Sequence, residues 1–387
     1  MNIFEKIKAG MELPEHEWAV IDSVRSFAAA ELGPRAAGID RSGEFPWENI
    51  AGINALGLNT MFIPEAYGGT ALSYRCYLAC VQEISAACAS TGIIWATNFH
   101  AMKPLIEFGT EEQKARLLPK VAEGALAALV ITEPSAGSDA TAMRTSFRDD
   151  GGGIVVNGAK SFITNGDVAD LYLVFGKWED EPDPRKAISC LVLEKGDASP
   201  SVIRLEEKMG HRGSSTAQLS FDDCRVPKSN LLAGPGEGLR ILLASLNRSR
   251  PSVAAHALGI AHAAFDDAIV YINERRQSGR RIAEFQGIQF LIADLAAELA
   301  LCDNWLNYVA AGIERGADMA MEASILKMRA SDLAMRMTTE AVQLHGGYGY
   351  CADYRVERLM RDAKITQIWE GTNQVHRQLI GRSFVKR

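Results

Sequence analysis

One carboxylate near the end of the chain has neighbours that suit acid–base chemistry. Glu370 stands between Trp369 and the pair Gly371-Thr372, within the stretch from Arg361 to Gln374. Apolar neighbours disfavour the charged form of a carboxylate and raise its pKa toward working pH, while glycine lets a substrate approach the backbone. Glu370 is therefore a candidate general base. An acid at the start of a short final helix would also complement the helix dipole, and these residues alone leave both interpretations open.

Two polar segments follow predicted strands and could bind a ligand. Thr132 to Asp139 offers hydroxyls, backbone amides and a flexible turn that can donate hydrogen bonds to a planar heterocycle or to phosphate. Phe162 to Gly166 places an aromatic ring and a hydroxyl before an Asn-Gly turn. Taken alone, a segment like the first is more often a capped turn, and one like the second is mostly a hairpin.

Two further segments near helix ends carry groups that could grip phosphate. Arg275 to Arg281 is rich in arginine, which binds a pyrophosphate bidentately, and Gln286 could add an amide. Cations are also favoured at a helix C-terminus for purely structural reasons. Gln343 to Gly349 is glycine-rich, but no strand precedes it and it lacks the Gly-x-Gly-x-x-Gly spacing, so it does not predict a Rossmann site.

Other classes of chemistry lack their signatures. The sequence has no Gly-x-Ser-x-Gly elbow, no phosphate loop ending in Gly-Lys-Ser/Thr, and no histidine with a metal-spaced partner, so we predict no metal site. The net charge of −7 and the scattered Lys and Arg argue against nucleic-acid binding. Seven cysteines without a Cys-x-x-Cys pair predict reduced thiols in a cytoplasmic protein. We see no export signal within residues 1–11 and no run of about 18 apolar residues for a membrane span.

The period of the apolar residues divides the chain into three parts. Helical spacing dominates residues 1–127, as in Trp18, Ile21, Val24 and Phe27. Strand-length runs separated by turns fill residues 128–238, too close together for crossover helices, which predicts an antiparallel barrel or sandwich. Long helical patterns return over residues 239–387 and predict a bundle of four helices. The expected fold is mostly α with a central β domain.

Six segments of the sequence, taken together, resemble acyl-CoA dehydrogenases in their order along the chain. They are residues 132–139, 162–166, 209–216, 343–347, 359–364 and 368–374. The layout of helices, β domain and helices is similar as well. The resemblance implies an FAD enzyme, an oxidoreductase of the CH–CH class, that removes an α-proton and a β-hydride from an acyl-CoA thioester. Glu370 then corresponds to the base, and the flavin N5 takes the hydride.

The resemblance also implies how the weakly acidic α-proton is removed. The thioester carbonyl would accept hydrogen bonds from the backbone N–H of Glu370 and from a flavin ribityl hydroxyl, which stabilises enolate character in a dry pocket. Some members place the base in the segment that corresponds to 247–250. The equivalent residue here is Ser249, which cannot serve, so Glu370 is the only candidate.

Family positions assign sixteen residues to the cofactor. Thr132 and Thr164 would bond the isoalloxazine, and Phe162 stands where Trp is commoner, which keeps stacking but removes an indole N–H. The pyrophosphate and adenosine would be held by Arg275, Gln286 and the 343–347 segment, largely from a neighbouring subunit. The full set is Leu129, Thr132, Ser138, Phe162, Ile163, Thr164, Arg275, Gln286, Gln343, Leu344, His345, Gly346, Gly347, Thr372, Asn373 and Gln374.

A smaller set matches acyl-CoA contacts. Asn247 replaces the usual Asp, which puts its contact with the thioester carrier in doubt. Bulky residues at the acyl pocket, among them Phe99, favour a short, branched or cyclic acyl group, although Trp95 could equally be plain core. The set is Ser138, Asn247, Arg250, Trp369, Gly371 and Trp95.

Partners follow from the same resemblance. It implies a homotetramer, a dimer of dimers, that passes electrons to an electron-transferring flavoprotein and acts in fatty acid or acyl-CoA metabolism. An oxygen-using oxidase, or a dehydrogenase of a carrier-protein-bound acyl group, would keep the same fold and flavin. A non-catalytic binding protein of this fold is the alternative of another class.

Overall fold

The first third of the chain is helical, as the spacing of its apolar residues predicts. The computed structural model describes residues 3–196 and 200–385 and buries Ile21 and Val24 on the inner face of α2. Thr110 caps α7 by accepting a hydrogen bond from the N–H of Gln113, whose side chain accepts one from the N–H of Thr110. The helices are α1 (Ile3–Ala9), α2 (Glu15–Phe27), α3 (Gly33–Ser42), α4 (Trp47–Ala55), α5 (Tyr74–Ala87), α6 (Ala89–Phe108) and α7 (Glu111–Ala122).

The middle of the chain forms a mixed sheet. Because side chains alternate across a strand, Leu173 and Phe175 of β4 enter one core, shared with α6 and α7, while Tyr172 and Val174 enter a second core beside Phe147. The sheet has the order β1-β4-β2-β3-β7-β6, with β5 also on β4. The strands are β1 (Ala127–Val130), β2 (Ser146–Asp149), β3 (Ile154–Thr164), β4 (Leu171–Trp178), β5 (Ile188–Glu194), β6 (Ser201–Leu205) and β7 (Thr216–Val226).

The expectation of an antiparallel sheet is wrong for two of its pairs. β1 and β2 both run parallel to β4, whereas the other pairs of this sheet are antiparallel. A crossover helix is unnecessary because β1 reaches β4 through the intervening strands β2 and β3. The fold class itself, mostly α with a β domain between two helical parts along the chain, is confirmed.

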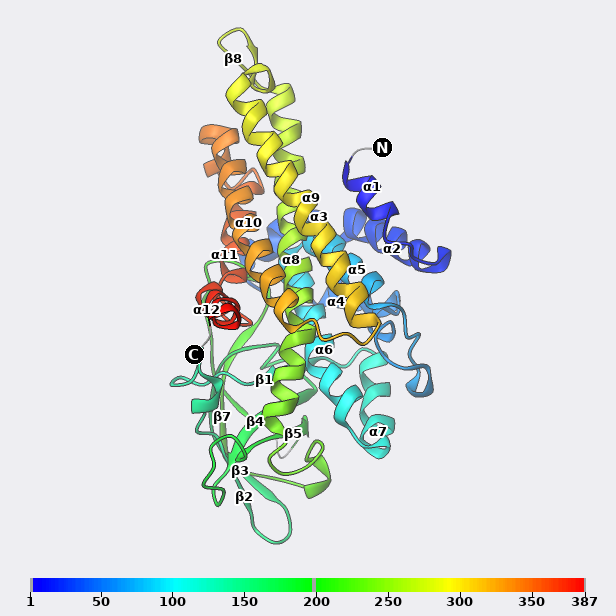
Figure 1. Cartoon of the computed structure of the whole chain (residues 1–387), viewed down its shortest axis with the longest axis vertical. Helices are drawn as coiled ribbons and strands as arrows, with labels where there is room; N and C mark the ends of the chain where they lie inside the picture. Colours follow the sequence, from blue (N-terminus) through cyan, green and yellow to red (C-terminus); the bar gives the residue numbers. More distant parts are fainter. Residues whose placement is uncertain (1–2, 197–199, 386–387) are drawn as a thin grey trace.

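Long helices form the last part of the chain. α8 runs through 37 residues and ends in a short hairpin at one tip of the molecule, at the opposite end from the β domain (Figure 1). By length and composition alone α8 could cross a membrane, but 72% of its most apolar window is buried inside the protein, as in a core helix. The elements are α8 (Gly238–Glu274), β8 (Arg276–Gln277), β9 (Arg280–Arg281), α9 (Gln286–Glu314), α10 (Ala320–His345), α11 (Val356–Thr366) and α12 (Asn373–Phe384).

α8 is the shared spine of the two helical parts. Its small residues, such as Ala254 and Ala261, belong to a single hydrophobic cluster with Tyr77 of α5, Trp95 of α6 and Leu326 of α10. The N-terminal and C-terminal helices therefore pack on one another rather than forming separate cores. The division of the chain after residues 127 and 238 stays a prediction.

Candidate active site

Glu370 lies on the turn that joins α11 to α12. The N–H of Trp369 still donates to the carbonyl of Ile365 at 3.1 Å, which continues the last turn of α11. Glu370 and Gly371 then take φ angles of +53° and +94°, in the left-handed region. Two such residues cannot continue a right-handed helix, and α12 begins only at Asn373. The expectation that Glu370 opens the final helix is thus corrected.

The Glu370 carboxylate is partly buried among one hydroxyl and two cations. The Ser249 hydroxyl on α8 donates to Glu370 Oε2 at 2.6 Å. Burial raises the pKa of Glu370, while the bond from Ser249 and the charges of Arg250 and Lys327 act in the opposite direction. A carboxylate tuned in this way can hold its charge at neutral pH and still accept a proton readily, which is what a general base needs.

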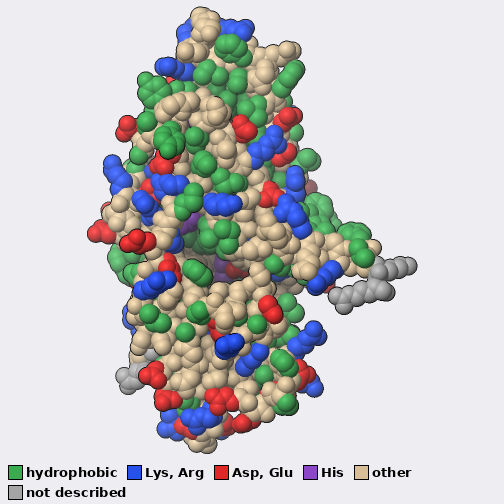
Figure 2. Space-filling model, turned by 90° about the vertical axis from the view of Figure 1, so that its left-hand side faces the viewer, with side chains coloured by type: hydrophobic (Ala, Val, Ile, Leu, Met, Phe, Trp, Pro, Cys, Tyr) green, Lys and Arg blue, Asp and Glu red, His purple; other side chains and the backbone are tan. Residues whose placement is uncertain are grey.

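Trp369 rests on two buried histidines. His211 and His256 share a hydrogen bond between their Nε2 atoms at 2.8 Å, and the indole ring lies 5.3 Å and 5.6 Å from the two imidazoles. His256 Nδ1 is bonded to the Ser85 hydroxyl at 2.8 Å. The face that carries α10 and α12 is hollowed near its middle, and histidine is visible in the depth of the hollow (Figure 2).

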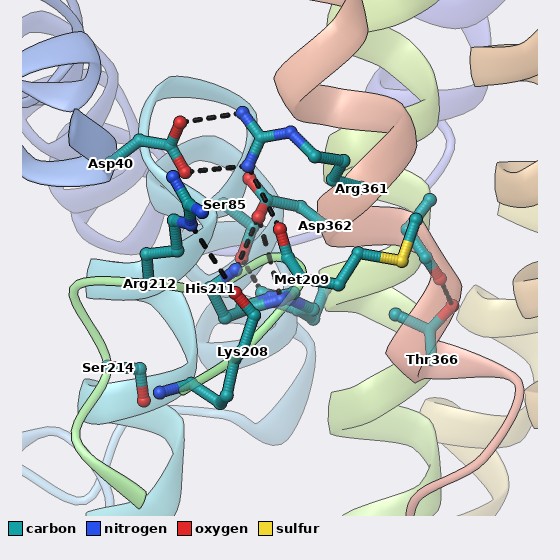
Figure 3. Close-up of polar contacts among 12 residues, drawn as sticks. Asp40, Ser85, Lys208, Met209, His211, Arg212, Ser214, Arg361, Asp362 and Thr366 are labelled. Atoms are coloured by element: carbon teal, nitrogen blue, oxygen red, sulfur yellow. Dashed lines mark hydrogen bonds and ion pairs between the residues drawn. The ribbon is translucent and has the colours of Figure 1, made fainter. Parts of the chain in front are cut away.

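A hydrogen bond and an ion pair fasten the loop that carries His211 to α11 and α3. The backbone N–H of His211 donates to Asp362 Oδ1 at 2.5 Å, and the neighbouring Arg361 binds both carboxylate oxygens of Asp40 on α3 at 2.9 and 2.6 Å (Figure 3). A Cβ at Gly210 would meet the Arg361 carbonyl at 2.5 Å. The glycine of the Met-Gly-His-Arg segment is therefore needed for the close approach of this loop to α11.

The histidine pair is neutral at neutral pH. Burial lowers the pKa of His256 to about 3 and that of His211 well below its ordinary value. Burial acts in the opposite sense on the neighbouring acid and raises the pKa of Asp362 to about 6. Beneath Trp369 the pair therefore provides an uncharged floor, which favours a dry environment beside the carboxylate.

In the β domain, a bulge presents Phe162 to solvent. The register of β3 against β7 shifts between Lys160 and Ile163, and Phe162 takes φ +59° and is 65% exposed. The Ser161 N–H donates to the Thr132 carbonyl at 2.8 Å, so the two predicted segments around Thr132 and Thr164 are brought together. Phe162 and Thr164 lie in the last three residues of β3, and their role in binding a cofactor stays a prediction.

A pocket of about 610 Å³ lies at the tip of the helical bundle, between α8, α9 and α10. Arg275 and the segment from Gln343 to Gly347 line it, together with Cys351. The pocket is largely aromatic on one side, because Tyr271 stacks on His345 at 4.2 Å and the Arg275 guanidinium lies 5.5 Å from the ring of Tyr348. The structure thus gathers most of the predicted phosphate and adenosine residues in one place.

The comparisons with known proteins agree on one family. Models of the acyl-CoA dehydrogenase N-terminal, middle and C-terminal domains match residues 14–125, 128–224 and 236–385. Over 96% of its length the chain is 40% identical to the short-chain specific acyl-CoA dehydrogenase of Clostridium acetobutylicum, of which it covers 99%. The chain belongs to the acyl-CoA dehydrogenase family.

Solved structures of two bacterial proteins superpose on this family member over nearly its whole length. Butyryl-CoA dehydrogenase from Megasphaera elsdenii has a TM-score of 0.94 and 37% identity, covering 97% of this chain and 99% of that one. A chain solved in work on the electron transferring flavoprotein of Acidaminococcus fermentans has a TM-score of 0.94, 41% identity and the same two coverages. Acyl-CoA dehydrogenases are FAD-dependent oxidoreductases that act on the CH–CH bond of acyl-CoA, so the predictions of enzyme class and cofactor are confirmed.

The two groups of candidate cofactor residues fit different parts of FAD. The exposed ring of Phe162 beside Thr164 suits an isoalloxazine, and the open pocket beside the exposed Arg275 suits the pyrophosphate and adenosine. Arg275, which lines the pocket, follows the end of α8, and that end of the helix lies at the opposite tip of the molecule from the β domain (Figure 1). Whether both groups serve one FAD within a protomer or across a subunit contact is a question of assembly, which belongs to the proposal below.

The remaining residues of the predicted FAD set differ in how far their side chains are exposed. Ser138, Gln286 and Gln374 are exposed, whereas Ile163 is 2% exposed. The Asn373 amide is engaged by α10, so any contact of this residue with FAD must come from its backbone. Leu129 and Thr372 are partly buried, and these assignments stay predictions.

Five of the six predicted acyl-CoA contacts lie on α6, α8 and the turn that carries Glu370, whereas Ser138 lies in the loop after β1. Asn247 Oδ1 accepts a hydrogen bond from Arg250 at 3.3 Å, so the amide that replaces the usual Asp is positioned by that arginine. Trp95 is only 1% exposed and packs on Tyr77 at 5.3 Å, within the core. Direct contact of Trp95 with an acyl group stays a prediction, and Trp369 is the better placed wall beside Glu370.

Sequence reasoning missed the groups that tune Glu370. Ser249 was considered only as a base, and Lys327 and His256 were not singled out, because each sits at an ordinary position in an apolar helical pattern. A lysine at a core-facing helical position is the one available signal for Lys327.

In the described part of the chain no group of three His, Cys, Asp or Glu could hold a metal ion.

Proposed function

We propose that this protein oxidises an acyl-CoA at its Cα–Cβ bond, with Glu370 removing the α-proton. The observation that supports this role is the placement of a partly buried carboxylate, bonded to Ser249 at 2.6 Å, on a left-handed turn beside Trp369. FAD, when bound, supplies the acceptor for the β-hydride. The chain's own task is to keep Glu370 charged and dry until the α-proton is transferred to its carboxylate.

Several features support a short, branched or cyclic acyl group. Trp369 restricts the space next to Glu370, and relatives at 37–40% identity are named for butyryl-CoA and for short chains. Anaerobic titration with a panel of acyl-CoA thioesters, followed by loss of the visible flavin absorption, would rank the substrates. The same titration with carrier-protein thioesters tests the carrier-bound alternative.

The assembly and the electron acceptor belong to the same proposal. Three side chains of α9, Phe290, Leu301 and Tyr308, are 51–70% exposed, and such residues favour burial against another copy of the chain. Together with the separated groups of FAD residues, this supports a homotetramer. An electron-transferring flavoprotein is the proposed acceptor, and release of peroxide under air would favour an oxidase instead. The cytoplasmic location also stays a prediction.

The variant Glu370→Gln tests the catalytic role directly. Glutamine keeps the size of the side chain but cannot accept the α-proton, so we expect the protein to retain its yellow flavin and to lose flavin bleaching by acyl-CoA. Glu357→Gln, which alters an acid ion-paired to Arg361 at 2.8 Å, is the matched control and should still bleach. Substantial turnover by Glu370→Gln would reject the assignment of the base.

A further inference from the structure

Lys327 is a buried cation directly beneath the catalytic turn. Its side chain on α10 is 0% exposed, and Nζ donates to the carbonyl of Gly371 at 2.7 Å and to Asn373 Oδ1 at 3.0 Å. Both acceptors are on or beside the turn that carries Glu370. The lysine therefore links the middle of α10 to Gly371, which follows the base, and to Asn373, the first residue of α12.

Among the described residues, no carboxylate lies within ion-pair distance of Lys327. The other fully buried lysine, Lys160, is paired with Glu133 at 2.8 Å. Burying an ammonium without a paired anion is costly, and burial lowers the pKa of Lys327 to about 7. A lysine in this position needs a nearby negative charge to remain protonated at neutral pH.

Among the charged groups around Lys327, Glu370 is the main source of that negative charge. On α8, Arg250 adds a second cation that is 8% exposed. Asp332, on α10 itself, is paired with Arg377 of α12 at 2.6 Å and accepts two further hydrogen bonds. His376 of α12 is held neutral, because burial lowers its pKa to about 3. The charges of Glu370 and Asp332 both favour the protonated form of Lys327, and the effect of Glu370 is the larger.

We propose that Lys327 is a positioning residue that fixes the Glu370-Gly371 turn through its bonds to Gly371 and Asn373 and serves as the buried countercharge of Glu370. This role rests on the proposed function of Glu370. Before the reaction the two charges offset each other, which keeps the base ionised in spite of its burial. When Glu370 takes up the α-proton, the lysine loses its countercharge, and this favours the return of that proton to solvent after turnover.

The pH profile of flavin bleaching separates this role from simple support of the turn. Lys327→Gln keeps a donor toward Gly371 but loses the charge, and Lys327→Met loses both. We expect both variants to move the acidic limb of the bleaching rate upward by about one pH unit, because an opposite charge nearby stabilises the carboxylate. Ser331→Ala, which removes a contact to Asn373 at 3.1 Å without changing any charge, should leave the limb in place. An unmoved limb in both lysine variants would overturn the proposal.

A second measurement does not depend on activity. The unfolding equilibria of the holoenzyme, Lys327→Met, Glu370→Gln and the double variant form a cycle, measured by urea denaturation at pH 7. If the two side chains are countercharges, Glu370→Gln should weaken folding by about fivefold more when Lys327 is present than when it is methionine. Additive effects would contradict the coupling. If no acyl-CoA in the panel bleaches the flavin of the unmodified protein, the proposed function fails. The unfolding cycle would still show whether Lys327 and Glu370 are coupled.

Discussion

The hydrogen bond from Ser249 to Glu370 gives a prediction whose size can be worked out from the structure. The O–H···O distance of 2.6 Å is that of a bond to a charged acceptor. The bond lowers the pKa of Glu370. Such bonds contribute about 1.5–3 kcal/mol, which corresponds to a displacement of about 1–2 pH units in the profile of an activity that needs the charged form. Since water can take the place of a small hydroxyl in a partly open site, the lower figure is the better expectation.

Ser249→Ala should therefore raise the pKa of the base. Glu370 acts only when deprotonated, so activity is lost as pH falls through its pKa, and the variant should lose activity at a pH about one unit higher. At the midpoint of the unmodified profile, the charged fraction drops from one half to about one tenth. Well above both pKa values the two proteins should bleach at similar rates.

Anaerobic rapid mixing with acyl-CoA from pH 5 to 9 would measure this shift through the rate of flavin bleaching. Ser252→Ala is a matched control on the same helix, because Ser252 is also buried and its hydroxyl bonds Tyr77 at 2.9 Å instead of the base. Ser249→Thr keeps the donor and should restore the original profile. An equal shift in Ser252→Ala, or none in Ser249→Ala, would refute the reasoning.

Three other predictions concern the cofactor, the fold and the assembly. Arg275→Ala should lose FAD during gel filtration, because the guanidinium lines the pocket, while Arg280→Ala on the adjacent hairpin should retain it; equal retention would contradict the pyrophosphate role. Burial lowers the pKa of His256 to about 3, so between that pH and about 6.5 the unfolded chain binds more protons than the folded protein. The melting temperature should therefore fall as pH drops through this window, and it should fall less steeply in His256→Asn. Leu301→Asp on α9 should reduce the assembly mass measured by light scattering; an unchanged mass would place the subunit contact elsewhere.

The helical parts of the fold were predictable because their signal is local. Helix ends such as the Thr110 cap of α7 follow from nearby residues alone. The sheet was harder: β2 was not foreseen, since Phe147 is its only large apolar residue, and its parallel pairing with β4 depends on contacts between distant segments. Periodicity carries no information about the direction of a partner strand.

The same distinction holds for the site. The family motif identified Glu370 and the two groups of candidate FAD residues, and the structure gathers each group in space. The residues that set the protonation of Glu370 come from other helices, more than 40 positions away for Lys327 and over 100 for Ser249. Their chemistry depends on burial and on the absence of nearer partners, which only the packed structure reveals.

The left-handed turn explains why so many parts of the chain converge on one carboxylate. A residue other than glycine at φ +53° costs about 1 kcal/mol, so Glu370 keeps this conformation only where its neighbours are fixed. Trp369 is fixed by the histidine floor, and Gly371 is fixed by Lys327. The His211 loop of the β domain, α8 and α10 therefore each hold one side of the turn. A change in any of them reaches the base by altering its orientation, and kinetic effects of substitutions at these residues should appear in the proton-transfer step before they appear in cofactor binding.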